Sequence, residues 1–325
     1  MSKLREKIVT EIRTSGVIPF PRFMELALYC PVFGYYEKEA DRIGRLGDFF
    51  TSVSVGPLFG SLLAWQFAEW LGNDLVHLVE AGAHRGELAR DILRWLKAER
   101  SQLFARVQYQ IVEPSDRQQK WQRQTLQEFG AKVEWLETLG EGQAINIRGV
   151  IFSNELLDAM PVRRLAWDAK EAQWFEWGVG VEKENLAWRR MPLIGEPPFP
   201  ENLRALLRQD LLEVLPDGFV VEICPAAEHW WLKAARALKT GKLVSLDYGF
   251  SGEEVFRPER AGGTLRAYGQ HRSSDDLLAN PGAQDITAHV NFESITQVGE
   301  KAGLTTSTFS TQANFLTGIL SRLTD

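Results

Sequence analysis

The sequence is poor in the residues that build disulfide frameworks and metal centres. It contains two cysteines among 325 residues, Cys30 and Cys224, and neither belongs to a Cys-x-x-Cys pair. No group of histidine, cysteine and acidic residues has the spacing of metal ligands, so we predict no metal site. Two isolated cysteines in an otherwise ordinary composition favour reduced thiols.

Long apolar runs and long runs of one charge are also absent. No stretch of ~20 apolar residues exists, so we predict no membrane span. The charged first seven residues lack the apolar segment of a signal peptide, and we therefore expect a cytoplasmic location. Lysine and arginine number 37 against 43 acidic residues, which gives a net charge of −6. Without a basic block, nucleic acid is not an expected partner.

What the sequence does contain is a series of apolar strands, four of which lead into polar residues at Glu80, Glu113, Asn154–Glu155 and Asp247. These strands are expected at residues 75–80, 107–113, 132–136, 149–153 and 242–247. Helical patterns at residues 87–99 and 116–128 separate the first three. This alternation predicts an α/β, Rossmann-type fold with a mostly parallel sheet covered by helices on both faces.

The middle of the chain has a different sequence pattern. Residues 162–191 alternate in hydrophobicity and are rich in aromatic side chains, which predicts antiparallel hairpin strands. We therefore predict three parts. They are an N-terminal helical cap with a Gly-Asp-Phe loop at 1–72, a core at 73–161 and 217–325, and an inserted β-rich and helical segment at 162–216.

A candidate ligand site follows from where the predicted strands end, because open parallel sheets bind ligands at the carboxyl ends of their strands. The first strand enters the turn Glu80-Ala-Gly-Ala-His-Arg-Gly86, where Gly82 and Gly86 let the backbone approach a ligand. Glu113 ends the next strand, where an acid can accept two ribose hydroxyl groups. The turn lacks G-x-G-x-x-G spacing, and the acid before it suits an ammonium group better than a pyrophosphate. S-adenosyl-L-methionine is therefore favoured over NAD.

The same turn is one of several motifs that occur in one order along nearly the whole chain. The others are Gly47-Asp-Phe-Phe-Thr51, Pro57-Leu-Phe-Gly60, Ser153-Asn-Glu-Leu-Leu-Asp-Ala-Met-Pro161, Glu222-Ile-Cys-Pro-Ala-Ala227, Asp247-Tyr-Gly249, Gly263-Thr-Leu-Arg-Ala267 and residues 281–292. With these motifs the chain resembles the MidA family of S-adenosylmethionine-dependent methyltransferases, whose mitochondrial members are complex I assembly factors with protein arginine methyltransferase activity. The resemblance implies a class I methyltransferase fold and methyl transfer to a protein side chain, with arginine of a respiratory complex subunit as the first candidate.

The strand ends and the resemblance together define the candidate site residues. We expect the cofactor to be bound by Asp48, Thr51, Glu80, Gly82, Gly86, Glu113 and Asn154, and the reaction to involve Glu155, Asp158, Asp247 and His271. Glu155 could bind a guanidinium group through two hydrogen bonds. Structural readings stay open for several of them: Asn154 could cap a helix that starts with Glu155, and Asp48 could hold an Asx-turn.

The sequence also departs from the usual family pattern. His84 replaces the middle glycine of the cofactor turn, Val53 and Ser54 replace Pro-Glu, Ser61 replaces an acid, and Asn291 replaces Asp. These departures keep a second hypothesis open, a catalytically impaired assembly or binding module that retains the fold. An NAD-dependent enzyme ranks third. A protein substrate is expected, and a homodimer is compatible with the sequence.

Overall fold

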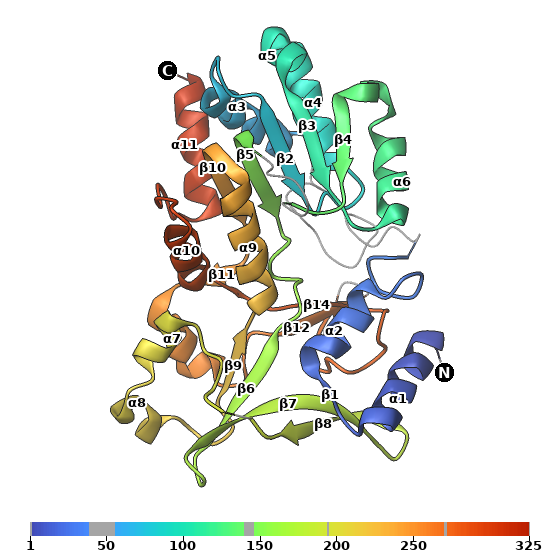
Figure 1. The fold of residues 1–325 in the computed structure, drawn as a ribbon, viewed down its shortest axis with the longest axis vertical. Coiled ribbons are helices and arrows are strands. Elements are labelled where there is room, and N and C mark those ends of the chain that lie inside the picture. The colour runs from blue at the N-terminus through green and yellow to red at the C-terminus, as the bar shows by residue number, and fades with distance from the viewer. Residues whose placement is uncertain (1, 39–55, 140–145, 194, 270–271, 325) are drawn as a thin grey trace. The chain divides into compact units, whose positions relative to one another are not determined.

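The computed structural model describes residues 2–38, 56–139, 146–193, 195–269 and 272–324. The chain forms two compact units, and each unit is assembled from three separate stretches (Figure 1). Unit 1 comprises Met1–Phe49, Leu157–His229 and Tyr248–Val298, and unit 2 comprises Phe50–Leu156, Trp230–Asp247 and Gly299–Asp325. Among the described residues, no helix has the length and apolar character needed to cross a membrane.

Unit 2 is built on a five-stranded sheet whose neighbouring strands are all parallel, in the order β10-β5-β2-β3-β4. The strands are β2 (His77–Ala81), β3 (Gln108–Val112), β4 (Val133–Leu136), β5 (Ile147–Asn154) and β10 (Leu238–Leu246). From β2 the chain moves outward to β3 and β4, and it then returns to the other side of β2 for β5 and β10. The order therefore reverses between β2 and β5, and ligands bind at such a reversal. The predicted α/β fold class is confirmed.

Helices cover both faces of this sheet. They are α3 (Leu58–Leu71), α4 (Glu87–Glu99), α5 (Ser101–Arg106), α6 (Asp116–Thr125), η1 (Gln127–Lys132), α11 (Gln312–Thr324) and part of α9 (Pro225–Ala237). Successive strand residues point to opposite faces. Leu78 of β2 therefore joins the core beneath α3 and α4, whereas Val79 packs on the other side with Ala234 of α9. The apolar side chains of α4 recur at helical spacing, which explains why that segment folds as a helix against the sheet.

Unit 1 contains an antiparallel sheet in the order β1-β7-β6-β9, with β8 paired to β7. The strands are β1 (Ile18–Pro19), β6 (Arg163–Asp168), β7 (Gln173–Glu182), β8 (Asn185–Met191) and β9 (Val220–Ile223). The hairpin strands predicted for residues 162–191 are thus confirmed. Small sheets are formed by β11 (Gly249–Phe250) with β15 (Val290–Asn291), and by β12 (Arg266–Gly269) with β13 (Arg272–Ser274) and β14 (Asp285–Thr287).

The helices of unit 1 lie at its N-terminus and in its later segments. They are α1 (Lys3–Ser15), α2 (Phe20–Tyr29), α7 (Glu201–Leu206), α8 (Gln209–Val214), η2 (Gly252–Phe256), η3 (Pro258–Arg260) and the start of α10 (Phe292–Lys301). Apolar side chains of α1 and α2, including Ile8 and Phe23, share a core with Ile18 and Val179 of the antiparallel sheet.

The two units differ from the predicted boundaries. β9 pairs antiparallel with β6, so residues 217–229 share a unit with the predicted insert. Tyr248–Val298 also belongs to unit 1. The predicted cap is divided, because α1 and α2 belong to unit 1 while α3 packs with α4 in unit 2. Local patterns identify a strand but not its pairing partner, which is why the sequence did not reveal this division.

Candidate active site

The glycine turn after β2 has the backbone geometry that its sequence predicts. Gly82, His84 and Gly86 have φ values of +71°, +45° and +83°, all in the left-handed region. A Cβ at Gly82 would lie 2.8 Å from Cδ1 of Leu156, and one at Gly86 would lie 3.3 Å from Cδ1 of Leu126. The turn is therefore packed closely against the segments that follow β5 and α6, and it leaves no room for side chains at either glycine.

Glu113 follows β3 beside this turn and is held by two donors. It is 5% exposed. Its Oε1 accepts a hydrogen bond from Ser115 N at 2.9 Å, and its Oε2 accepts one from Gln122 Nε2 at 3.1 Å. These two hydrogen bonds fix the orientation of the Glu113 carboxylate beside the glycine turn.

Gln122 of α6 is a site residue that sequence analysis missed. It is fully buried, and its Nε2 donates both to Glu113 Oε2 and to the carbonyl oxygen of His84, the latter at 2.9 Å. Its Oε1 accepts a hydrogen bond from Trp135 Nε1 at 2.8 Å. The signal in the sequence is weak: α6 is a strongly polar helix, and the side chains it buries are those of Gln118 and Gln122.

Glu80, which is predicted to contact an ammonium group of the cofactor, is buried and bonded to a core side chain. Its side chain is buried, and Oε2 accepts a hydrogen bond from the Tyr109 hydroxyl at 2.6 Å. Burial raises the pKa of Glu80 to about 7, although the Tyr109 hydrogen bond acts in the opposite direction. Tyr109 belongs to the core beneath α3 and α4. The structure thus gives Glu80 a structural partner, and its contact with the cofactor stays a prediction.

The ends of β5 and β10 bring three predicted residues together. Asn154 is paired with Leu246 at the last register position, and Asp247 follows directly. Glu155 has a φ of +49° and donates its N–H to Leu246 O at 2.9 Å. The next N–H, of Leu156, donates to Asp247 Oδ2 at 3.2 Å. The next element after β5 is the strand β6, so the alternative reading of Asn154 as a helix cap is wrong, and Glu155 and Asp158 do not share a helix.

The remaining predicted residues are not placed with this group. Asp158 belongs to unit 1, where it is buried, whereas Glu155 belongs to unit 2. Asp48, Thr51 and His271 lie outside the described residues. Within the part of the chain that the structure describes, no cluster of three histidine, cysteine or acidic residues could hold a metal ion.

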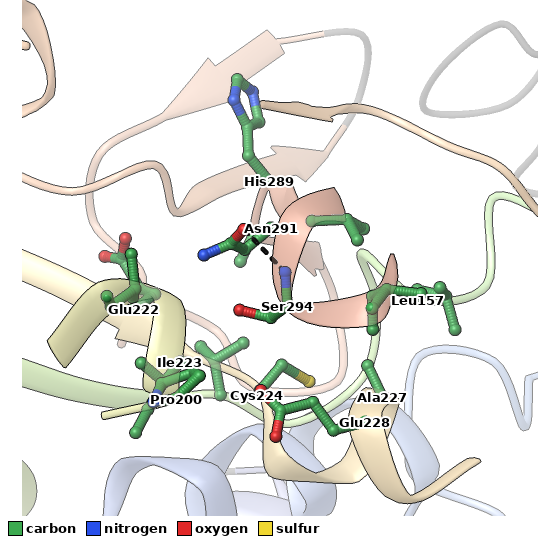
Figure 2. A pocket seen from close by; sticks show the side chains of 15 residues that line it. Leu157, Pro200, Glu222, Ile223, Cys224, Ala227, Glu228, His289, Asn291 and Ser294 are labelled. Carbon is green, nitrogen blue, oxygen red and sulfur yellow. Dashed lines mark hydrogen bonds between the residues drawn. The ribbon is translucent and has the colours of Figure 1, made fainter. Parts of the chain in front are cut away.

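A small pocket lies within unit 1, beside β9 and the start of α10 (Figure 2). Glu222 borders it from β9. Its Oε2 accepts a hydrogen bond from Thr264 N at 2.8 Å, and burial raises the pKa of its carboxyl. Asn291 of β15 and Ser294 of α10 also border the pocket, and Asn291 Oδ1 accepts a hydrogen bond from Ser294 N at 3.2 Å. The volume of about 20 Å³ suits a water molecule rather than a nucleoside.

The parallel sheet, its reversal of strand order and the glycine turn after β2 define unit 2 as Rossmann-type. Comparison with protein families identifies the protein further. Residues 62–310 match the model of a family described as "Putative S-adenosyl-L-methionine-dependent methyltransferase". Because the match spans most of the chain, the protein belongs to this family. The enzyme class and cofactor predicted from the sequence are confirmed.

Individual relatives agree with this assignment. The chain is 27% identical to the mitochondrial protein arginine methyltransferase NDUFAF7 of Xenopus laevis, over 92% of this chain and 70% of the relative. The human protein of the same name is 26% identical, over 90% of this chain and 68% of the relative. A crystal structure from Burkholderia thailandensis with bound S-adenosyl-homocysteine is 34% identical and has a TM-score of 0.85, over 99% of this chain and 82% of that one. The fold and the family are therefore shown independently.

Proposed function

We propose that the protein transfers a methyl group from S-adenosyl-L-methionine to an arginine side chain of a protein substrate. The observation that carries this proposal is the similarity, over nine-tenths of the chain, to relatives named protein arginine methyltransferases. A subunit of a respiratory complex is the first substrate to test, because the family resemblance implies a role in complex I assembly.

The described residues of unit 2 fit the cofactor. Two observations support the fit: a turn with positive φ values at Gly82, His84 and Gly86, and a neighbouring carboxylate whose orientation is fixed by two donors. Glu113 would accept the ribose hydroxyls, and Gly82 and Gly86 would let the backbone pass close to the bound molecule. Asn154, at the end of β5, would contribute a side-chain amide. When bound, the cofactor supplies a sulfonium-activated methyl group.

The ends of β5 and β10 supply the groups for the arginine. The carboxylate of Glu155 would bind the guanidinium through two hydrogen bonds and hold its nitrogen in line for the transfer. The left-handed backbone of a non-glycine residue costs about 1–3 kcal/mol and persists where surrounding contacts fix it. Here the fixing contacts are the bonds from Glu155 N to Leu246 O and from Leu156 N to Asp247 Oδ2. Asp247 would therefore act as a positioning residue for Glu155.

Methylation assays with a binding control test this proposal. The purified protein is incubated with labelled S-adenosyl-L-methionine and respiratory complex subunits, and methylarginine is identified by mass spectrometry. Glu155→Gln should abolish methylation and change the affinity for S-adenosyl-homocysteine by less than about threefold. The exposed Glu99→Gln, at the end of α4, is the matched control and should change neither. Loss of cofactor binding in Glu155→Gln would contradict the role proposed for Glu155.

A second candidate function is a binding or assembly module with an impaired site. The observation that favours it is the side chain of His84 at a left-handed position of the cofactor turn, where the family usually has glycine. Failure of the wild-type protein to bind S-adenosyl-homocysteine at millimolar concentration would support this module over the enzyme.

A further inference from the structure

We infer that Gln122 is a positioning residue for cofactor binding: it sets the orientation of the Glu113 carboxylate and ties it to the glycine turn. The inference rests on the proposed role of Glu113 as the ribose-binding acid. Gln122 is fully buried in unit 2, and its side-chain amide makes three hydrogen bonds there.

The orientation of the Gln122 amide is determined by Trp135. An indole N–H can only donate, so the atom 2.8 Å from Trp135 Nε1 must be the amide oxygen of Gln122. The amide nitrogen then faces the other way, toward Glu113 Oε2 at 3.1 Å and His84 O at 2.9 Å. Both amide hydrogens are therefore engaged, one by the acid after β3 and the other by the turn after β2.

This arrangement has a consequence for ribose binding. A carboxylate can accept both ribose hydroxyls only if its two oxygens face them. Nε2 of Gln122 donates to Oε2 and Ser115 N donates to Oε1, so these two donors determine how the carboxylate is rotated. Loss of the Gln122 amide would leave two buried acceptors, Glu113 Oε2 and His84 O, without this donor.

The same helix offers a matched control. Gln119, three residues before Gln122, also binds Glu113, but its Nε2 donates to the main-chain carbonyl oxygen at 2.8 Å and not to the carboxylate. Gln119→Met and Gln122→Met remove the same chemical group from α6. Only the second removes a partner of the carboxylate.

The experiment measures the affinity for S-adenosyl-homocysteine and for its 2′-deoxy analogue by calorimetry. Gln122→Met should weaken S-adenosyl-homocysteine binding at least tenfold, and Gln119→Met by less than threefold. Gln122→Met should also lower the preference for S-adenosyl-homocysteine over the 2′-deoxy analogue. A purely structural role of Gln122 would weaken both ligands equally and would overturn the inference, as would unchanged affinity in the folded variant.

A double mutant distinguishes a failure of this inference from a failure of the proposed ribose-binding role of Glu113. Glu113→Ala should weaken binding at least tenfold, and adding Gln122→Met to it should weaken binding less than threefold further. If the two effects multiply instead, Gln122 does not act through Glu113. If Glu113→Ala leaves the affinity unchanged, the ribose assignment fails, and the positioning role fails with it.

A second variant serves if Gln122→Met does not fold. Gln122→Glu places a second carboxylate beside Glu113. It is expected to weaken binding at least tenfold and to remove the preference for S-adenosyl-homocysteine over the 2′-deoxy analogue. An unchanged preference in that variant would overturn the inference.

Discussion

His84 combines a left-handed backbone with a side chain at the turn that approaches the cofactor. Its φ is +45°, and left-handed conformations are uncommon outside glycine, although histidine adopts them more readily than most residues. The carbonyl of His84 is held by Gln122, so the backbone conformation is fixed by a buried partner.

Replacing His84 with glycine should tighten binding of S-adenosyl-homocysteine. Relief of about 1 kcal/mol of backbone strain corresponds to roughly fivefold in affinity if the strain increases on binding. The free energy of unfolding should change by less than about 1 kcal/mol, because glycine also gains entropy in the unfolded chain. Lys183→Gly is the control, since Lys183 has a φ of +46° in the β7–β8 turn of unit 1. It should leave the affinity unchanged, and weaker binding in His84→Gly would contradict the prediction.

The buried carboxyl of Glu80 gives a pH dependence of stability. Its pKa is raised from 4.5 to about 7 by burial. Between these values the unfolded chain releases the proton while the folded protein keeps it, so the free energy of unfolding falls as pH rises, by about 3 kcal/mol in total. Glu80→Gln keeps an acceptor for Tyr109 but cannot ionise. Its stability relative to wild type should therefore rise between pH 4.5 and pH 8 in denaturant titrations, and a constant difference would disprove the assignment.

At the scale of elements, the turns after β2 and β5 are packed on each other. A Cβ at Gly82 would lie 2.8 Å from Cδ1 of Leu156, so this contact between the two turns requires a glycine. Gly72, at the end of α3, has a φ of +50°, but a Cβ there would meet no atom within 4 Å. Substitution of Gly72 therefore tests backbone strain alone, whereas substitution of Gly82 tests backbone strain together with close packing.

Gly72→Ala should cost about 1–3 kcal/mol of stability through the backbone alone, because φ +50° with ψ −135° lies outside the regions that other residues readily adopt. Gly82→Ala should cost about 1–3 kcal/mol more, because Leu156 must move to admit the Cβ. Only Gly82→Ala should weaken binding of S-adenosyl-homocysteine, by at least tenfold, since the displaced segment carries the turn after β5. Thermal unfolding and calorimetry check both variants. Equal effects of the two substitutions on affinity would contradict the packing argument.

The elements were also what the sequence predicted best. Apolar strands that end in Glu80, Glu113 and Asn154 follow from local composition, and the structure places them in neighbouring strands of one sheet. Gln122 was missed because a buried glutamine is recognisable only from its partners on other elements. The alternative reading of a helix after Asn154 was wrong, since Glu155 adopts a left-handed backbone conformation that differs from that of an α-helix.

At the scale of the whole molecule, the described residues that we assign to the cofactor all belong to unit 2. Hydrogen exchange should reveal this distribution. On addition of S-adenosyl-homocysteine, amide protection should rise at residues 82–86 and 113–122, because a ligand that binds the native state suppresses local opening. The β7–β8 hairpin of unit 1 is the internal reference and should exchange unchanged. Protection confined to that hairpin would show that the cofactor site has been misplaced.

The division of each unit into three stretches affects how the protein is made. β5 is covered on one edge by β2 and on the other by β10, which begins roughly 80 residues later in the chain. At ribosomal rates of about 5–20 residues per second, this delay is on the order of ten seconds. Throughout it, a long apolar strand has an open edge that can pair with other chains. We therefore expect the newborn chain, rather than the finished enzyme, to be the form most dependent on chaperones.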